Sequence, residues 1–315
     1  MIKRTIDISN APARLRLELG QIVIQREGHP DHHAPAEDIG VLLVDEQRTS
    51  YTHAAMVGLM EAGACVILCD RQHLPCGVLL PMAANELLTQ RLRTQIAVPL
   101  PRKKRLWQQI IRAKLRSQAR NVRSLAKDTD AAAAIEALVP SVGSGDPKNC
   151  EGQAARIYWE ALLGKGFRRQ RGGAWPNPIL NYGYMVMRAA VARAIAAAGL
   201  HPAFGIHHHN RGNAFCLADD LMEPLRALVD AKAWTLLSAW EGGPEPSVTP
   251  EAKRIMLGLL AEDVELRGQA GPLMVQLHRV AAGLWNCYSG EQDKLDLPTY
   301  NHTESENLGE ETADD

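Results

Sequence analysis

The spacing of apolar residues changes near Val98, and this change limits the folds open to the chain. Before it, short apolar runs bounded by turn residues predict strands. After it, apolar residues recur at helical spacing. A run of strands followed by a run of helices is typical of a fold in which the two kinds of element are segregated. We therefore expect an α+β fold, with an N-terminal antiparallel β domain followed by an all-helical C-terminal domain.

The N-terminal part carries the pattern of half-buried strands. Apolar and charged residues alternate from Arg14 to Leu19, a period of two that buries one face of a strand. The predicted strands cover residues 4–9, 14–18, 21–26, 40–45, 64–70 and 77–80, and one helix is expected at 51–62.

The remainder predicts helices and a polar tail. Thr249 followed by Pro250 is a helix-start signal, and Gly199 ends an alanine-rich helix. The predicted helices cover residues 106–127, 130–138, 151–163, 182–199, 219–240, 250–266 and 272–288. The chain is thus divided into a β-rich domain (1–88), a basic linker (89–104), a helical domain (105–290) and an acidic tail expected to be disordered (291–315).

Size and composition indicate a soluble protein. A chain of 315 residues with 46% hydrophobic residues can bury a sizeable core. The six cysteines form no CxxC pair and are expected to stay reduced. The most apolar helical stretch, Met185–Leu200, is interrupted by Arg188 and Arg193, so we expect a cytoplasmic protein without a membrane span.

The net charge of -1 conceals a strongly basic segment, which the acidic tail offsets. Twelve Lys and Arg lie between Arg91 and Lys127 without one acidic residue, which favours contact with a polyanion over a solvated helical face. A second basic stretch, Lys165–Gly173, lies beside Trp175 and could grip a phosphate backbone or form a flexible loop.

Imidazoles and carboxylates are concentrated in one short region. The triplet His207–His209 precedes Asp219, Asp220 and Glu223, and Glu151 begins another helix upstream. On a helix starting at Asp219, either aspartate can share a face with Glu223. These acids could instead cap a helix and complement its dipole. Three adjacent imidazoles exceed what capping needs, so the region predicts a site for one divalent metal.

Three blocks in this part of the chain resemble one family. They are Glu-Gly-Gln-Ala-Ala-Arg at 151–156, Leu-Asn-Tyr-Gly-Tyr at 180–184, and a Gly-x-x-His block that runs to Asp-Leu-Met-Glu-Pro, at 205–224. Their types and order resemble the integrase of CRISPR spacer acquisition, in the form found in type II systems.

The resemblance implies a ligand set. Its metal histidine lies fifteen residues before the glutamate of Asp-Leu-Met-Glu-Pro, which selects His208 here, with Glu151 and Glu223 as the other ligands. Asp220 matches a further acidic position and is carried as a secondary metal ligand. One imidazole with carboxylates suits Mg²⁺ or Mn²⁺.

The resemblance also implies an activity and partners. A 3′ hydroxyl of a short foreign DNA duplex would attack a phosphodiester of the CRISPR leader-repeat, a transesterification assisted by the metal. The chain would form a homodimer through its N-terminal domain and bind a small ferredoxin-like partner, and it could associate with the type II effector nuclease. Candidate DNA contacts are Arg102, Lys103, Lys104, Arg105, Arg168, Arg169, Arg171 and Tyr182. For Tyr182, packing in the core is favoured over a contact with DNA.

Two other functions remain open at this point. A stand-alone metal-dependent nuclease for branched DNA would use the same ligands with water as the nucleophile. A non-catalytic DNA-binding module would use the basic segment alone, with the acids as helix caps. Replacement of Glu151 by Ala would abolish chemistry in the two enzymes and leave DNA binding intact in the module.

Overall fold

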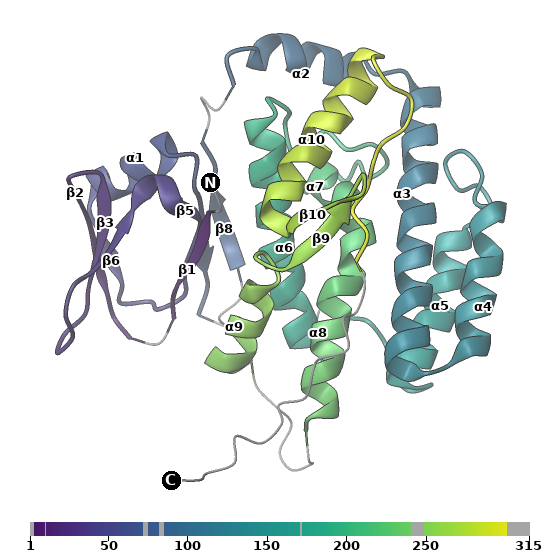
Figure 1. Ribbon diagram of the computed structural model, residues 1–315, viewed down its shortest axis with the longest axis horizontal. Coiled ribbons are helices and arrows are strands. Elements are labelled where there is room, and N and C mark those ends of the chain that lie inside the picture. The colour runs from purple at the N-terminus through teal and green to yellow at the C-terminus, as the bar shows by residue number, and fades with distance from the viewer. Residues whose placement is uncertain are drawn as a thin grey trace.

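The computed structural model describes residues 3–9, 11–71, 75–81, 85–170, 172–240 and 248–300. Its N-terminal part contains two four-stranded sheets, and its C-terminal part is mostly helical (Figure 1). The predicted order of a β region followed by a helical region is therefore confirmed. The N-terminal elements are β1 (Arg4–Ile8), β2 (Arg14–Glu18), β3 (Gln21–Gln25), β4 (His32–Pro35), η1 (Ala36–Asp38), β5 (Ile39–Val44), β6 (Ser50–Tyr51), α1 (His53–Glu61), β7 (Cys65–Cys69) and β8 (Pro75–Leu79).

Both N-terminal sheets are mixed, so the expectation of an antiparallel domain is wrong. In the sheet ordered β1-β5-β7-β8, β5 runs parallel to β1 and to β7, and only β8 is antiparallel. In the sheet ordered β4-β3-β2-β6, the hairpins are antiparallel and β6 is parallel to β2. Helix α1 provides the crossover that parallel strands β5 and β7 require. Side-chain alternation along one strand does not report its direction relative to a neighbour.

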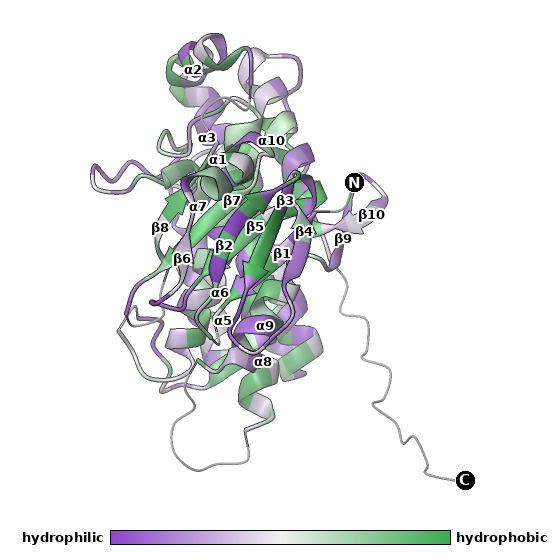
Figure 2. Cartoon of the chain, turned by 90° about the vertical axis from the view of Figure 1, so that its left-hand side faces the viewer, coloured by the Kyte–Doolittle hydropathy of each residue, from purple (hydrophilic) through white to green (hydrophobic). Residues whose placement is uncertain are grey.

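The two faces of the sheet that contains β5 pack against two different hydrophobic cores. Every residue of β5 is buried, as expected for a strand covered on both faces. Leu42 and Val66 pack in the core beneath α1, whereas Val41 and Ile67 pack in the larger core of the helices. Strands β5 and β7 accordingly stand out as apolar in Figure 2. The β region thus supports the helical region through one continuous sheet.

The elements of the helical region are α2 (Leu88–Ala97), α3 (Leu100–Asn121), η2 (Val122–Ala126), α4 (Thr129–Leu138), η3 (Val139–Ser141), α5 (Cys150–Leu163), α6 (Asn177–Ala197), α7 (Cys216–Met222), η4 (Glu223–Leu225), α8 (Arg226–Ser238), α9 (Pro250–Gly258), β9 (Asp263–Leu266), β10 (Gln269–Pro272) and α10 (Leu273–Ser289). In this region, α7, α8, α9 and α10 all pack against α6.

Two of the predicted helices differ from the structure. The helix expected at 250–266 ends at Gly258, and a β9-β10 hairpin follows it. Arg267 and Gly268 turn that hairpin with φ of 54° and 74°, which is the two-residue turn that suits twisted strands. The helix expected at 219–240 is interrupted at Pro224, which lies in the first turn of η4 and cannot continue the hydrogen-bond ladder of α7.

The predicted linker and tail are also more ordered than expected. Residues 89–104 include most of α2 and the start of α3 rather than an extended linker. The tail was expected to begin at 291, but Leu295 and Tyr300 are buried, and the Tyr300 hydroxyl donates to Asn121 Oδ1 at 3.0 Å. The acidic residues 301–315 lie outside the described residues. Within those described, every helix is too short or too polar to span a lipid bilayer.

Candidate metal centre and adjoining pocket

Glu151 is fixed by the loop that starts α5. The Asp146 carboxylate accepts the backbone N–H groups of Cys150 at 3.0 Å and Glu151 at 2.9 Å. The Asn149 side chain accepts the N–H of Gly152 at 3.1 Å as the helix N-cap. A Cβ at Gly152 would lie 2.7 Å from the Asn149 amide nitrogen, so a larger residue there would displace this capping side chain. The first turn of α5 thus presents Glu151 in a defined position.

The histidine triplet lies in the loop between α6 and α7 and wraps around one carboxylate. Asp220 is fully buried and accepts the backbone N–H groups of Ile206 at 2.6 Å, His207 at 2.9 Å and His208 at 3.2 Å. A Cβ at Gly205 would overlap the His208 carbonyl oxygen, so the loop closes over Asp220 only with glycine there. Asp220 therefore holds this loop in place.

Asp220 also orients the His208 ring. His208 Nδ1 lies 2.6 Å from Asp220 Oδ1, and because a carboxylate only accepts, Nδ1 carries the proton. This hydrogen bond raises the pKa of His208 in spite of partial burial. The His208 side chain remains 44% exposed, which leaves Nε2 at the far edge of the ring as the nitrogen able to bind a metal.

Trp107 on α3 supports the same loop, and the sequence did not indicate it. Its indole stacks on the His207 ring at 4.2 Å with an interplanar angle of 4°, and meets the His208 ring edge-on at 5.6 Å. Partial burial lowers the pKa of His207, which favours the neutral ring in this stack. His207 thus supports the loop through its stack on Trp107, and both His207 and His208 remain exposed.

Glu223 is a buried carboxylate at the start of η4, held by two cations. Arg226 Nε donates to Glu223 Oε1 at 2.8 Å, and Lys114 Nζ lies 2.6 Å from Glu223 Oε2. Burial alone would raise the pKa of Glu223, but Arg226 and then Lys114 outweigh it and lower that pKa to about 2. Glu223 therefore remains ionised at neutral pH.

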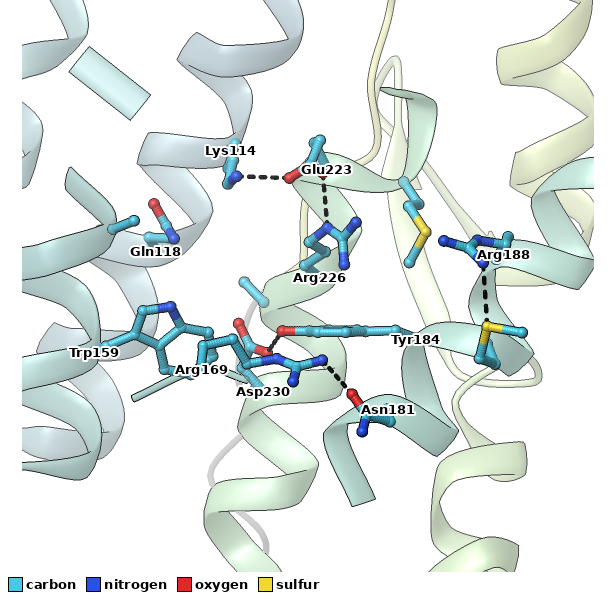
Figure 3. A pocket seen from close by; sticks show the side chains of 14 residues that line it. Lys114, Gln118, Trp159, Arg169, Asn181, Tyr184, Arg188, Glu223, Arg226 and Asp230 are labelled. Atoms are coloured by element: carbon cyan, nitrogen blue, oxygen red, sulfur yellow. Dashed lines mark hydrogen bonds and ion pairs between the residues drawn. The ribbon is translucent and has the colours of Figure 1, made fainter. Parts of the chain in front are cut away.

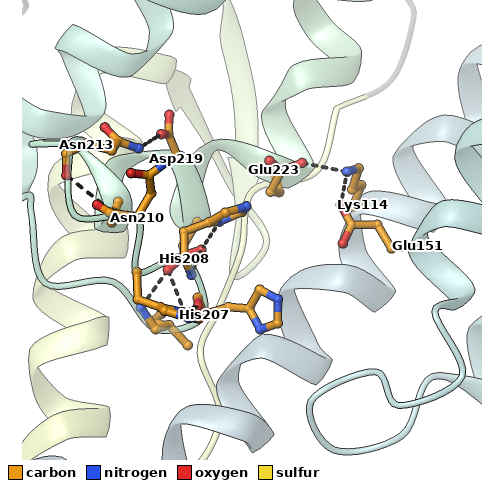
Figure 4. Close-up of polar contacts among 12 residues, drawn as sticks. Lys114, Glu151, His207, His208, Asn210, Asn213, Asp219 and Glu223 are labelled. Atoms are coloured by element: carbon orange, nitrogen blue, oxygen red, sulfur yellow. Dashed lines mark hydrogen bonds and ion pairs between the residues drawn. The ribbon is translucent and has the colours of Figure 1, made fainter. Parts of the chain in front are cut away.

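Lys114 joins the two glutamates that the sequence singled out separately. Its ammonium lies 2.5 Å from Glu151 Oε1 as well as 2.6 Å from Glu223 Oε2 (Figure 4). His208 and Asp220 form a second pair beside them, and Glu223 is among the charges that raise the pKa of His208. Among the described residues, no three His, Cys, Asp or Glu side chains converge closely enough to hold a metal.

A cavity of about 450 Å³ adjoins Glu223 and carries several cations (Figure 3). Lys114, Arg169, Arg188 and Arg226 line it, with Tyr184 among them. Arg188 Nε donates to Asp219 Oδ1 at 2.7 Å, so that aspartate faces an arginine. Arg169 donates to the side-chain oxygens of Asn177 at 3.0 Å and Asn181 at 2.7 Å. Because these acceptors are neutral, the charge of Arg169 is available to an anion.

Tyr184 lines this cavity in a fixed orientation. The Arg169 and Arg226 guanidinium groups lie 5.0 and 4.7 Å from its ring centroid, and its hydroxyl donates to buried Asp230. Burial, followed by the Asp230 charge, raises the pKa of Tyr184 well above its ordinary value. Tyr184 therefore stays protonated and does not act as a nucleophile.

The predicted DNA contacts are placed very differently by the fold. Tyr182 is completely buried and cannot touch DNA. Side chains two residues apart on a helix point about 200° away from each other around its axis. Tyr184 therefore faces the cavity and Tyr182 faces the core. Arg102 donates to the carbonyl oxygen of Cys287 at 3.1 Å, at the end of α10. Lys103 lines a pocket with His208, and Lys104 and Arg105 are exposed. Arg168 lies in the loop before α6, and Arg171 lies outside the described residues.

Much of the acid-free basic segment serves packing rather than a single polyanion surface. Arg91 donates to the carbonyl oxygen of Ala198 at 2.6 Å, Arg112 to that of Val142 at 2.9 Å, and Arg120 to that of Tyr300 at 2.8 Å. These arginines satisfy carbonyl groups at helix ends and in loops. The exposed cations of the segment are Arg93, Lys104, Arg105, Arg116, Arg123 and Lys127.

Residues 6–245 match the family model described as CRISPR associated protein Cas1. The chain belongs to the Cas1 family. The resemblance seen in the three sequence blocks is thereby confirmed, and with it membership of a family of CRISPR-associated endonucleases. The CRISPR-associated endonuclease Cas1 of Neisseria meningitidis serogroup C (strain 8013) is 38% identical over 270 residues, which cover 85% of this chain and 86% of that protein.

Solved structures share the Cas1 fold with this chain. A casposase bound to its integration product superimposes with a TM-score of 0.76 at 18% identity, covering 99% of this chain and 96% of the casposase. A chain of a Cas6-RT-Cas1–Cas2 complex gives a TM-score of 0.72 at 18% identity, covering 93% of this chain and 36% of that longer one. At these identities the likeness establishes the fold.

Proposed function

We propose that the chain is a metal-dependent DNA integrase that inserts short foreign fragments into a CRISPR array. The observation that carries the proposal is the pairing of Glu151 and Glu223 around a cationic group, with His208 beside them and its Nε2 directed away from Asp220. Two carboxylates and one imidazole are a ligand set for Mg²⁺ or Mn²⁺.

The donor types present suit such an ion, although no three of them converge among the described residues. Glu223 Oε2 is buried and lies 2.6 Å from the Lys114 ammonium, so a cation already lies beside it. A buried carboxylate oxygen of this kind is stabilised by a cation. Glu151, His208 and Glu223 would hold the metal, and Asp220 supports the site as the carboxylate that orients His208, because its oxygens accept four hydrogen bonds already.

A bound divalent ion would act at this position as a Lewis acid on a DNA phosphate. The chain itself supplies binding and orientation. Arg169 offers its guanidinium to phosphate oxygens in the cavity, and Arg226 keeps Glu223 ionised. Asp230 holds Tyr184 as a neutral phenol, so Tyr184 does not form a covalent link to DNA. A 3′ hydroxyl of DNA is the nucleophile that the proposal assigns.

The family and its structural neighbours support the partners that we propose. One neighbour is a casposase bound to an integration product, and another belongs to a complex of Cas1 with Cas2. We assign to this chain a duplex with free 3′ ends, a leader-repeat target, a homodimeric state, a small ferredoxin-like partner and an association with a type II effector nuclease. Among the predicted DNA contacts, Arg169 lines a cavity with Glu223, and Lys103 lines a pocket with His208.

The test is a joining reaction. The purified chain and its operon partner are mixed with Mn²⁺, a short duplex and a supercoiled plasmid that carries the leader and repeat. Joining at the repeat, lost in Glu151→Ala and with blocked 3′ hydroxyls, is the expected result. Cleavage without joining would identify a nuclease for branched DNA. Tight DNA binding without chemistry in the wild type would identify a binding module.

A further inference from the structure

Lys114 is a buried lysine between two glutamates from different elements. It lies on α3 and is 9% exposed, whereas Glu151 starts α5 and Glu223 starts η4. Its ammonium contacts both carboxylates, at 2.5 and 2.6 Å (Figure 4). On α3 it lies two turns beyond Trp107, which packs on the histidine loop, so one face of α3 contacts both halves of the site.

The two carboxylates beside Lys114 compensate the positive charge of its ammonium, at 2.5 and 2.6 Å, in a largely buried place. Without this ammonium, two carboxylates would face each other in a largely buried place, an arrangement that is strongly unfavourable unless a cation lies between them. Arg226 also faces this group, but it contacts the other oxygen of Glu223.

We propose that the Lys114 ammonium is an internal stand-in cation, which holds Glu151 and Glu223 together in the metal-free protein and competes with the divalent ion for their oxygens. This inference rests on the proposed function, since it takes these two glutamates to be metal ligands. Lys114 is a positioning residue in this account, and it sets how tightly the site binds its metal.

The displaced ammonium would move into the adjoining cavity. Lys114 also lines the 450 Å³ cavity that holds Arg169, Arg188 and Arg226. An ammonium moved from between the glutamates would join those guanidinium groups, where a phosphate group of the substrate brings negative charge. Metal binding would thus release the charge of Lys114, which already lines the cavity, from the glutamates toward a DNA phosphate.

The first test measures metal affinity rather than catalysis. Mn²⁺ binding to the full-length protein is followed by calorimetry for wild type, Lys114→Met and Arg116→Met, an exposed cation on the same helix. Lys114→Met should bind Mn²⁺ at least about tenfold more tightly, because the competing charge is gone, and Arg116→Met should match the wild type. Equal or weaker binding by Lys114→Met would overturn the inference.

The second test measures thermal stability in chelator and in Mn²⁺. Lys114→Met should unfold at a lower temperature than the wild type in chelator and should gain more from Mn²⁺. The double variant Lys114→Met with Glu223→Gln should regain stability in chelator, since one of the two facing charges is removed. If Lys114→Met is insoluble without metal, soluble expression in Mn²⁺-supplemented medium supports the inference, and insolubility in both contradicts it.

Failure of the inference differs from failure of the proposed function. If Glu223→Gln binds Mn²⁺ as the wild type does, these glutamates do not hold the metal and the proposed function fails. If Glu223→Gln loses binding while Lys114→Met leaves it unchanged, the metal site stands and only the stand-in role of Lys114 is wrong.

Discussion

His208 Nδ1 lies 2.6 Å from Asp220 Oδ1, and this contact separates the roles of the two acids on α7 and η4. Asp220 is engaged with the backbone of the histidine loop, whereas Glu223 Oε2 lies against the Lys114 ammonium. The sequence left open which of the two approaches the metal. The contacts favour Glu223 as the ligand and Asp220 as the residue that orients His208.

Asp220→Asn should weaken metal binding without removing a ligand. An amide nitrogen cannot accept the loop N–H groups, so the histidine loop and the His208 ring should lose their fixed orientation. We expect Mn²⁺ affinity and joining activity to fall by about 10- to 100-fold, as for other carboxylates that support a metal-binding histidine. Calorimetry and the joining reaction measure the two effects. Unchanged affinity would show that Asp220 does not orient the site.

Gly205→Ala should disturb the same loop from the backbone side. The new methyl group would overlap the His208 carbonyl oxygen and crowd Asp220, at a cost of about 1–3 kcal/mol for forced packing. We expect a lower melting temperature and loss of joining. Gly212→Ala is the matched control, because its Cβ would lie 3.6 Å from the Asn210 side chain, an ordinary contact. Equal effects of the two changes would argue against a specific closure over Asp220.

Asp230 should make stability depend on pH. Burial raises its pKa to about 6 from 3.8, despite hydrogen bonds from Tyr184 and Tyr158. Between these values the folded protein binds a proton that the unfolded chain releases, so the free energy of unfolding falls as pH rises through this window. The expected loss above pH 6 is on the order of 3 kcal/mol.

Denaturant unfolding between pH 4 and 7 tests this dependence. The wild type should lose stability relative to Asp230→Asn as the pH rises, because the amide cannot ionise. Asp130→Asn changes an exposed acid in the first turn of α4 and should follow the wild type. Parallel curves for wild type and Asp230→Asn would contradict the raised pKa.

Arg169→Ala should weaken DNA binding in a salt-dependent way. Its guanidinium lines the cavity and is bound by neutral oxygens, so it can neutralise one phosphate. We expect lower affinity and a slope of log affinity against log salt that is smaller by about 1. Arg123→Ala removes an arginine already paired with Glu136 at 2.8 Å and should leave the slope unchanged. An unchanged slope for Arg169→Ala would exclude it as a phosphate contact.

The sequence predicted those features that local patterns encode. Alternation and helical spacing placed most strands and helices, and the motif at Glu151 predicted the helix that the Asn149 cap begins. Strand direction could not be predicted, because the pairing of β5 with β1 and β7 depends on connections distant in sequence. The Arg267-Gly268 turn did carry a local signal, a glycine after a polar residue, which would have divided the helix expected at 250–266.

The site required tertiary contacts that no motif contains. Lys114 was counted only as one cation of a basic segment, yet α3 packs between α5 and η4 and brings it to Glu151 and Glu223. A lysine among Ile110, Ile111 and Leu115 was the available signal, because a charge among buried positions needs a partner. Tyr182 shows the opposite case, since a motif residue proved to be core.

Anomalous diffraction from crystals of the wild-type protein grown with Mn²⁺ would locate the metal directly. We expect one strong peak within coordination distance of a Glu151 oxygen, Glu223 Oε2 and His208 Nε2, with the Lys114 ammonium moved away from the glutamates. Absence of a peak at this place, or a peak held by other residues, would contradict the assignment of Glu151, His208 and Glu223 as the metal ligands.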